Sequence, residues 1–205
     1  MTKFRNIKSF NDCNRFMVFA GSSFKRVSNV HRAQLRIIYI LLFTTSIPLK
    51  DILFISYFQL LIGLKTGQIP VYNRKKKEFN FYIFPSVTTL HSVPKEIRYL
   101  FLTKGFLFLG SSKGGISDKI YSIYRLKNVI AKDMSSTAKR YNVKGCFGAQ
   151  SFINGYEAKI LTICNVDEAD IIMNKGSMRE HYFNKLSPFY IRSLFAKEYL
   201  KRSGL

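Results

Sequence analysis

Two short runs of basic residues are the groups in this sequence best suited to bind a charged partner. The first run is Arg74, Lys75, Lys76 and Lys77, and the second comprises Lys139, Arg140 and Lys144. Ammonium and guanidinium groups at this density bind the phosphates of a polyanion, because each contact releases a condensed counterion. The two runs therefore predict a surface for nucleic acid or for an anionic membrane.

The composition of the whole chain favours the same kind of partner. Its 205 residues include 33 Lys and Arg against 12 Asp and Glu, which gives a formal net charge of +21. Hydrophobic residues make up 47%, enough for a folded core, so wholesale disorder is excluded. The most apolar stretch, residues 37–64, is interrupted at Pro48 and Asp51 before it reaches the ~18 apolar residues of a membrane span. We therefore expect no membrane span, and of the two polyanions we expect nucleic acid and no membrane as the partner.

Metal and cofactor chemistry is not indicated. The histidines and cysteines are scattered along the chain at His31, His91, His181, Cys13, Cys146 and Cys164. No CxxC pair is present, so we expect small buried thiols in a reducing compartment and no metal site. The glycine-rich segment 110–115 matches neither a Walker motif nor a dinucleotide fingerprint, so no cofactor is expected.

The elements that must position the basic runs are mainly helices. A helical pattern starts at His31, ends at Thr44 and Thr45, and is followed by a second helix with Pro48 in its first turn. Gln68–Asn73 and Phe79–Phe84 read as two strands with the first basic run at their tip. Residues 1–30 are basic and weakly periodic, which is typical of an N-terminal arm.

The second half of the chain continues the helical pattern. After a loop at 110–115, Ser117 or Asp118 caps a long helix, and the second basic run is a loop before a helix over 151–163. Asp167 caps a short helix, residues 94–101 form another, and residues 187–205 form a last amphipathic one. The sequence thus predicts an α+β protein that is mainly α-helical, with one small antiparallel β-hairpin or sheet.

This order of elements, and several local segments, resemble the catalytic domain of the tyrosine recombinases, the phage-integrase family. Residues 42–53 resemble the family's "LLYTGLRISELL" box, residues 150–158 resemble "HSLRRTFA", and residues 179–185 resemble the terminal "T.rYyn" box. The resemblance covers roughly residues 30–186. It implies a catalytic domain over 31–186, followed by a C-terminal helix over 187–205 that would join copies into a homo-oligomer on DNA.

The resemblance also implies a chemistry and its residues. Tyr182 lies where the nucleophile attacks a DNA phosphate to form a 3′-phosphotyrosine, and Lys77 where a hairpin lysine protonates the leaving 5′-oxygen. Lys175 and Arg179 join the two basic runs as expected DNA contacts. The family's two arginines and its histidine fall on Pro48, Asn154 and Ser151, none of which carries charge.

Three functions therefore stay open. The first is a DNA-binding protein of the recombinase family, with site-specific breakage and rejoining that is weak or absent. The second is a non-catalytic nucleic-acid-binding module with the same fold, and the third is a basic RNA-associated protein. For the first two we expect double-stranded DNA as the partner and the basic runs around one concave surface. The abundance of Lys, Ile, Phe, Asn and Tyr suggests an intracellular, DNA-associated product of an AT-rich genome, such as that of a plastid, a bacterium or a mobile element.

Overall fold

A computed structural model describes residues 10–21, 29–45, 47–73, 77–83, 109–112, 115–120 and 122–172. Its elements, in chain order, are α1 (Phe10–Val18), α2 (Asn29–Thr45), α3 (Leu49–Ile52), α4 (Tyr57–Thr66), β1 (Gln68–Asn73), β2 (Glu78–Ile83), β3 (Leu109–Ser112), β4 (Gly115–Ile120), α6 (Ile123–Arg140), α7 (Ala149–Ile163) and α8 (Val166–Ile172). The chain is an α+β protein, mainly helical, as the sequence predicts. The helices expected at 94–101 and 187–205 lie outside the described residues.

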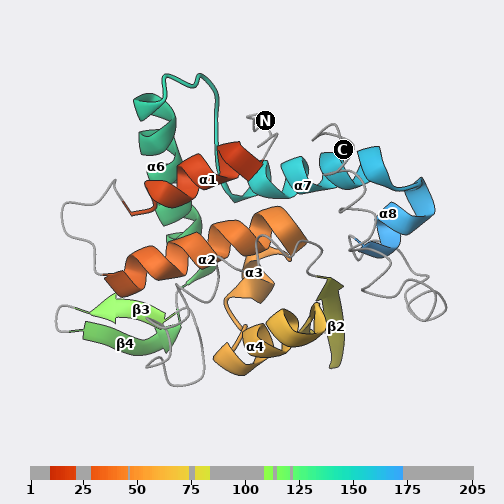
Figure 1. Ribbon diagram of the computed structural model, residues 1–205. Coiled ribbons are helices and arrows are strands. Elements are labelled where there is room, and N and C mark those ends of the chain that lie inside the picture. The colour runs from red at the N-terminus through yellow and green to blue at the C-terminus, as the bar shows by residue number, and fades with distance from the viewer. Residues whose placement is uncertain are drawn as a thin grey trace.

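Helix α2 is the centre of the core, with α1, α3 and α7 packed against it (Figure 1). A helix at the surface buries one stripe, whereas α2 is apolar around most of its circumference. Leu35, Ile37, Tyr39 and Leu41 are all at most 1% exposed, although they point in different directions around the helix. The sequence predicts a single buried face, whereas α1, α3 and α7 together cover several sides of the helix.

Helix α1 lies within the segment that the sequence indicates as a basic arm. Phe16 and Met17 of this helix are buried, and α1 packs against both α2 and α6. The ring of Phe16 contacts Phe147 and Phe152 at centroid distances of 5.5 and 5.8 Å, and Phe152 stacks on Tyr39 at 5.0 Å. An aromatic cluster therefore joins α1, α2 and α7.

The helix expected after Pro48 is divided into α3 and α4. Ser56 starts a new helix because its side chain accepts a hydrogen bond from the Gln59 N–H at 3.2 Å, while the Gln59 side chain accepts from the Ser56 N–H at 2.7 Å. This reciprocal pair is a capping box, which satisfies backbone donors that a continuous helix would bond internally. Gly67 ends α4 with φ of 82°, a left-handed conformation that glycine adopts without strain.

Strands β1 and β2 form the predicted antiparallel hairpin, in a register that pairs Gln68 with Ile83 and Asn73 with Glu78. The sequence does not predict the second antiparallel pair, β3 and β4, because its glycines and serines are typical of a loop and a helix cap. Ser117 and Asp118 lie in β4. The residue that caps α6 is Ser122, whose side chain accepts from the Arg125 N–H at 3.2 Å.

The last described helices follow the sequence pattern closely. Helix α7 starts two residues before the expected Ser151 and ends at the expected Ile163. Helix α8 is capped by Asn165 rather than Asp167: the Asn165 side chain accepts from the Glu168 N–H at 2.8 Å, and Glu168 accepts from the Asn165 N–H at 3.2 Å. Either residue type can cap a helix, so the sequence locates the helix but misses its cap by two positions.

Candidate nucleic-acid interface

Lys77 is the member of the first basic run that the structure describes. It is exposed at the tip of the β1–β2 hairpin and has a φ of 56°. A positive φ is uncommon for a residue with a side chain and marks the tight reversal that links the two strands. Arg74, Lys75 and Lys76 lie outside the described residues, as do Lys175, Arg179 and Tyr182.

The second basic run lies at the C-terminal end of α6 and in the turn that follows. Lys139 and Arg140 form the last turn of α6, where positive charge is favourable at the negative end of the helix dipole, and Lys144 follows in the turn. All three side chains are exposed. The run is therefore half helical, which corrects the prediction of a loop from residue 139 onward.

Aromatic rings hold part of this second group in place. The Arg140 guanidinium lies over the Phe19 ring at 4.8 Å from its centroid, and Arg15 lies over Tyr141 at 5.4 Å. Phe19 and Tyr141 contact each other edge to face at 5.4 Å. Two cations and two rings thus join the ends of α1 and α6. Arg15 also forms an ion pair with Asp12 at 3.6 Å, so Arg140 is the cation of this group that is better placed for a phosphate.

The end of α6 that has the second basic run lies apart from the β1–β2 hairpin, which has Lys77. In Figure 1 the C-terminal end of α6 lies at the upper left, and the β1–β2 hairpin lies at the lower right, with α2 between them. Because Arg74, Lys75 and Lys76 lie outside the described residues, a single concave surface that gathers both runs stays a prediction. A ligand that contacts both Lys77 and this end of α6 has to extend across the molecule.

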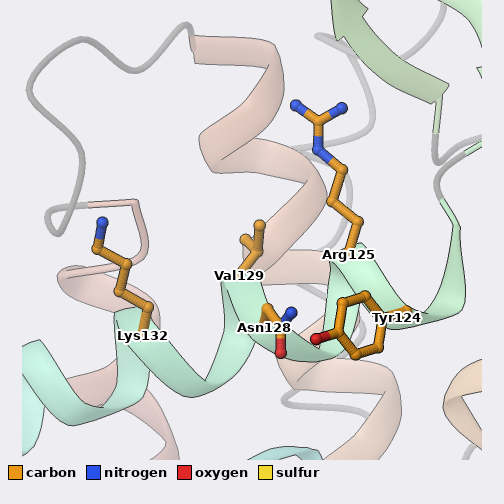
Figure 2. A pocket seen from close by; sticks show the side chains of 5 residues that line it. All are labelled: Tyr124, Arg125, Asn128, Val129 and Lys132. Carbon is orange, nitrogen blue, oxygen red and sulfur yellow. The ribbon is translucent and has the colours of Figure 1, made fainter.

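A shallow hollow of about 260 Å³ runs along α6 and contains cations that the sequence analysis does not single out. It is lined by Tyr124, Arg125, Asn128, Val129 and Lys132. Figure 2 shows the Arg125 and Lys132 side chains extending from the same side of α6, with Val129 between them. They are seven residues apart, which is about two helical turns or roughly 10 Å along the axis. The helical spacing of these charges is the signal that could have found them.

The positions that match the family's charged catalytic groups have structural roles here. Pro48 precedes α3, and its carbonyl accepts from the Asp51 and Ile52 N–H groups at 2.8 and 3.1 Å. Ser151 is fully buried, and its hydroxyl accepts from the Gly148 N–H at 3.1 Å at the start of α7. Pro48 and Ser151 therefore stabilise the first turns of α3 and α7.

Asn154 lies one turn further along α7 and is half-buried. Its side-chain oxygen accepts a hydrogen bond from the Gln150 amide at 2.6 Å. A neutral amide in this position can donate to a phosphate oxygen but supplies no positive charge. The described positions Pro48, Ser151 and Asn154 therefore offer no cation to a phosphate in its transition state.

A buried carboxylate is the main polar feature that sequence reasoning misses. Asp133 of α6 is fully buried, and its two oxygens accept from the Gly21 N–H at 2.9 and 3.0 Å. One of these oxygens also accepts from the Tyr39 hydroxyl at 2.8 Å. Asp133 thus connects the end of the α1 segment, α2 and α6. The signal in the sequence is an acidic residue on the apolar face of α6.

Burial disfavours the reactive, deprotonated form of two described nucleophiles, Cys164 and Tyr156. Burial, with a smaller contribution from Glu168, raises the pKa of the Cys164 thiol to about 11, so it stays protonated at neutral pH. Burial also raises the pKa of the Tyr156 phenol. Cys146 is exposed, which corrects the expectation that it is a small buried residue. Neither Cys164 nor Tyr156 is poised to attack a phosphate.

The described residues contain neither a metal-binding cluster nor a membrane-spanning helix. Among them, no three or more His, Cys, Asp or Glu side chains are grouped so that they could hold a metal ion. Likewise, none of the described helices has the length and apolar character needed to cross a membrane.

Comparison with known proteins gives a structural likeness and no match by sequence. No family model matches the chain, and no curated protein matches it. Among solved structures, XerA recombinase superposes with a TM-score of 0.60 at 12% sequence identity, and the match covers 96% of this chain and 66% of that chain. This chain therefore spans slightly less than two thirds of the XerA chain. The likeness shows a recombinase-type fold, in agreement with the fold that the sequence predicts.

Proposed function

We propose that this protein binds double-stranded DNA through its phosphates, on a recombinase-type fold that has lost most or all of the strand-breaking chemistry. The observation that carries the proposal is the combination of this fold with a net charge of +21. Phosphate contacts depend on charge rather than on a catalytic constellation, so DNA binding can persist after the chemistry is lost.

The expected loss of chemistry follows from the charge that phosphoryl transfer requires. A tyrosine hydroxyl has a pKa of about 10 and attacks a phosphate poorly unless neighbouring charge activates it and stabilises the transition state. Pro48, Ser151 and Asn154 supply no such charge. Removing one donor of this kind commonly lowers a rate by ~10²–10³, and the losses within one site are not simply additive. We therefore expect Tyr182 to react very slowly or not at all.

The test combines a binding measurement with a covalent trap. Binding of the full chain to a duplex is measured over a series of salt concentrations, and we expect log affinity to fall linearly with log salt, with a slope of about 0.9 for each phosphate neutralised. A set of duplexes of varied sequence, each with a nick, traps any protein–DNA adduct, and the Tyr182→Phe variant identifies its origin. We expect steep salt dependence and no adduct from either protein.

Each other outcome has a distinct meaning. A Tyr182-dependent adduct formed within minutes would show an active recombinase and overturn the proposed loss of chemistry. Affinity independent of salt would overturn phosphate-based DNA binding.

The Ser151→Ala variant serves as the matched control. Losing the hydrogen bond between its hydroxyl and the Gly148 N–H should lower the free energy of unfolding by about 1 kcal/mol and leave DNA affinity unchanged.

A further inference from the structure

The β1–β2 hairpin has two different faces, which follow from the alternation of side chains along its strands. The inner face packs towards α4 and is buried at Ile69, Val71, Asn80 and Tyr82. The register places Tyr72 opposite Phe79 and Pro70 opposite Phe81 on the outer face. We call these four residues the hairpin outer face.

The hairpin outer face is aromatic where an exposed face of a small sheet is normally polar. Tyr72, Phe79 and Phe81 are 42%, 55% and 43% exposed. The Tyr72 and Phe79 rings contact each other at a centroid distance of 5.3 Å and an interplanar angle of 59°. This cross-strand pair stabilises the hairpin and still leaves about half of each ring accessible.

Charge identifies the class of ligand that suits these rings. Between Gln68 and Ile83 the chain has four cations, Arg74 to Lys77, against one acid, Glu78. A second copy of this chain would bring the same excess of positive charge, so pairing two such faces places like charges together. An anionic ligand with flat apolar groups has the complementary chemistry.

We propose that the hairpin outer face is a stacking platform for unpaired bases of single-stranded nucleic acid. Every base offers a flat face to a ring, and Lys77, exposed beside this face, can bind a phosphate next to the stacked base. In an intact duplex the base faces are covered by their neighbours, so this site is distinct from phosphate-based duplex binding. The inference does not depend on the function proposed above.

The experiment separates stacking from charge by using two strands with the same phosphates. Binding of the full chain is measured by fluorescence anisotropy for a thymidine strand of about twelve nucleotides and for an abasic strand of equal length. The variant is Tyr72→Leu/Phe79→Leu, which keeps both side chains apolar. The matched control is Phe58→Leu, an exposed aromatic residue (70%) on α4.

We expect the wild type to prefer the thymidine strand, and the double variant to lose about 5- to 150-fold in affinity for it. Affinity for the abasic strand should be the same for all proteins, and Phe58→Leu should match the wild type. Circular dichroism checks folding. If the double variant is unfolded, Phe79→Leu alone and the comparison of the two strands with the wild type still test the proposal.

Three results would overturn it. Equal wild-type affinity for the two strands would show that charge alone accounts for binding. An unchanged affinity of a folded double variant would place any stacking elsewhere. Sedimentation showing a wild-type dimer that the double variant abolishes would make this face a contact between copies. Duplex binding, measured in parallel, succeeds or fails independently of all three.

Discussion

Asp133 shows how a single residue can stabilise the arrangement of three elements. Its carboxylate is buried and accepts hydrogen bonds from two distant parts of the chain, the Gly21 N–H and the Tyr39 hydroxyl. Hydrogen bonds to a charged acceptor contribute more than neutral ones, and buried donors left unpaired carry a desolvation penalty. The residue is therefore important for stability.

We predict that Asp133→Ala lowers the free energy of unfolding by roughly 3 kcal/mol, because it leaves buried donors without an acceptor. Tyr39→Phe should cost less, about 1.5 kcal/mol, since Asp133 keeps its contact with Gly21. Urea denaturation of both single variants and the double variant measures the two effects and their coupling. A loss below about 1 kcal/mol for Asp133→Ala would contradict the assigned role.

A second single residue, His31, makes the stability of the protein depend on pH. Burial lowers the pKa of His31 below its usual value, with a smaller contribution from Arg125, although the Gln34 hydrogen bond and Asp133 act in the opposite direction. The unfolded chain then binds the proton more readily than the folded one. Stability should therefore rise with pH through the region just below about 6.5, and fall as the pH drops through it.

We predict that His31→Gln removes this part of the pH dependence. Denaturation midpoints of the wild type and the variant are compared between about pH 5 and pH 7, and the wild type should lose more stability on acidification. Identical pH profiles would show that His31 titrates equally in both states. A steeper loss in the variant would contradict the sign of the shift.

The sequence is informative about residues whose partners are close along the chain. The helix-starting role of Pro48 and the capping role of Ser151 depend on contacts within about four residues, so the residue types alone indicate them. Asp133 bonds to Gly21 and Tyr39 across separations of 112 and 94 residues. Such contacts follow from the packing of helices, which no local pattern predicts.

At the scale of elements, local signals explain both the success and the errors of the prediction. The β1–β2 hairpin alternates inward and outward side chains, and the sequence predicts its first strand at the observed bounds. The apolar pattern continues across the break at Ser56, so only the Ser56–Gln59 capping box reveals the new helix. Segment 110–120 reads as a loop and a cap because glycine and serine are typical of loops.

The contact between α4 and β1 provides a prediction for this scale. A Cβ added at Gly63 would overlap the Cγ1 atom of Ile69, which is fully buried. We predict that Gly63→Ala destabilises the protein by roughly 1–3 kcal/mol, although alanine in a helix normally gains ~1 kcal/mol over glycine. Thermal denaturation measures the loss, and Lys65→Ala on the exposed side of α4 is the control.

A double-variant cycle tests the cause of this loss. Removing most of the Ile69 side chain makes room for the new methyl group, so Gly63→Ala should cost less in the Ile69→Ala background than in the wild type. If Gly63→Ala destabilises the protein equally in both backgrounds, contact with the Ile69 side chain is not the reason why glycine is needed at position 63.

At the scale of the whole molecule, the distribution of charge matters more than any single contact. Lys77 lies at the β1–β2 hairpin, whereas Lys139 and Arg140 lie at the far end of α6, with α2 between these two elements in Figure 1. Arg125 and Lys132 add positive charge along α6 itself. Sequence composition predicts the excess of charge but not its separation into two groups, because relative position depends on the tertiary fold.

This separation leads to a prediction about DNA binding. We expect Lys75→Gln/Lys76→Gln/Lys77→Gln at the hairpin and Lys139→Gln/Lys144→Gln at α6 each to weaken duplex binding. The salt slope should fall by about 0.9 for each phosphate that the variant no longer neutralises. Arg140 is left in place because it packs on Phe19. Since the two sites are far apart, their effects on binding free energy should add in the combined variant.

The control for this prediction is Lys50→Gln/Lys65→Gln, which removes two exposed charges from α3 and α4 without changing either basic run. Long-range attraction depends on total charge and is screened by salt, whereas a phosphate contact depends on position. The control should therefore leave the salt slope close to that of the wild type. If the control variant lowers the salt slope as much as Lys139→Gln/Lys144→Gln does, the binding reflects net charge alone. If substitution of one basic run leaves duplex affinity unchanged, DNA contacts the other run only.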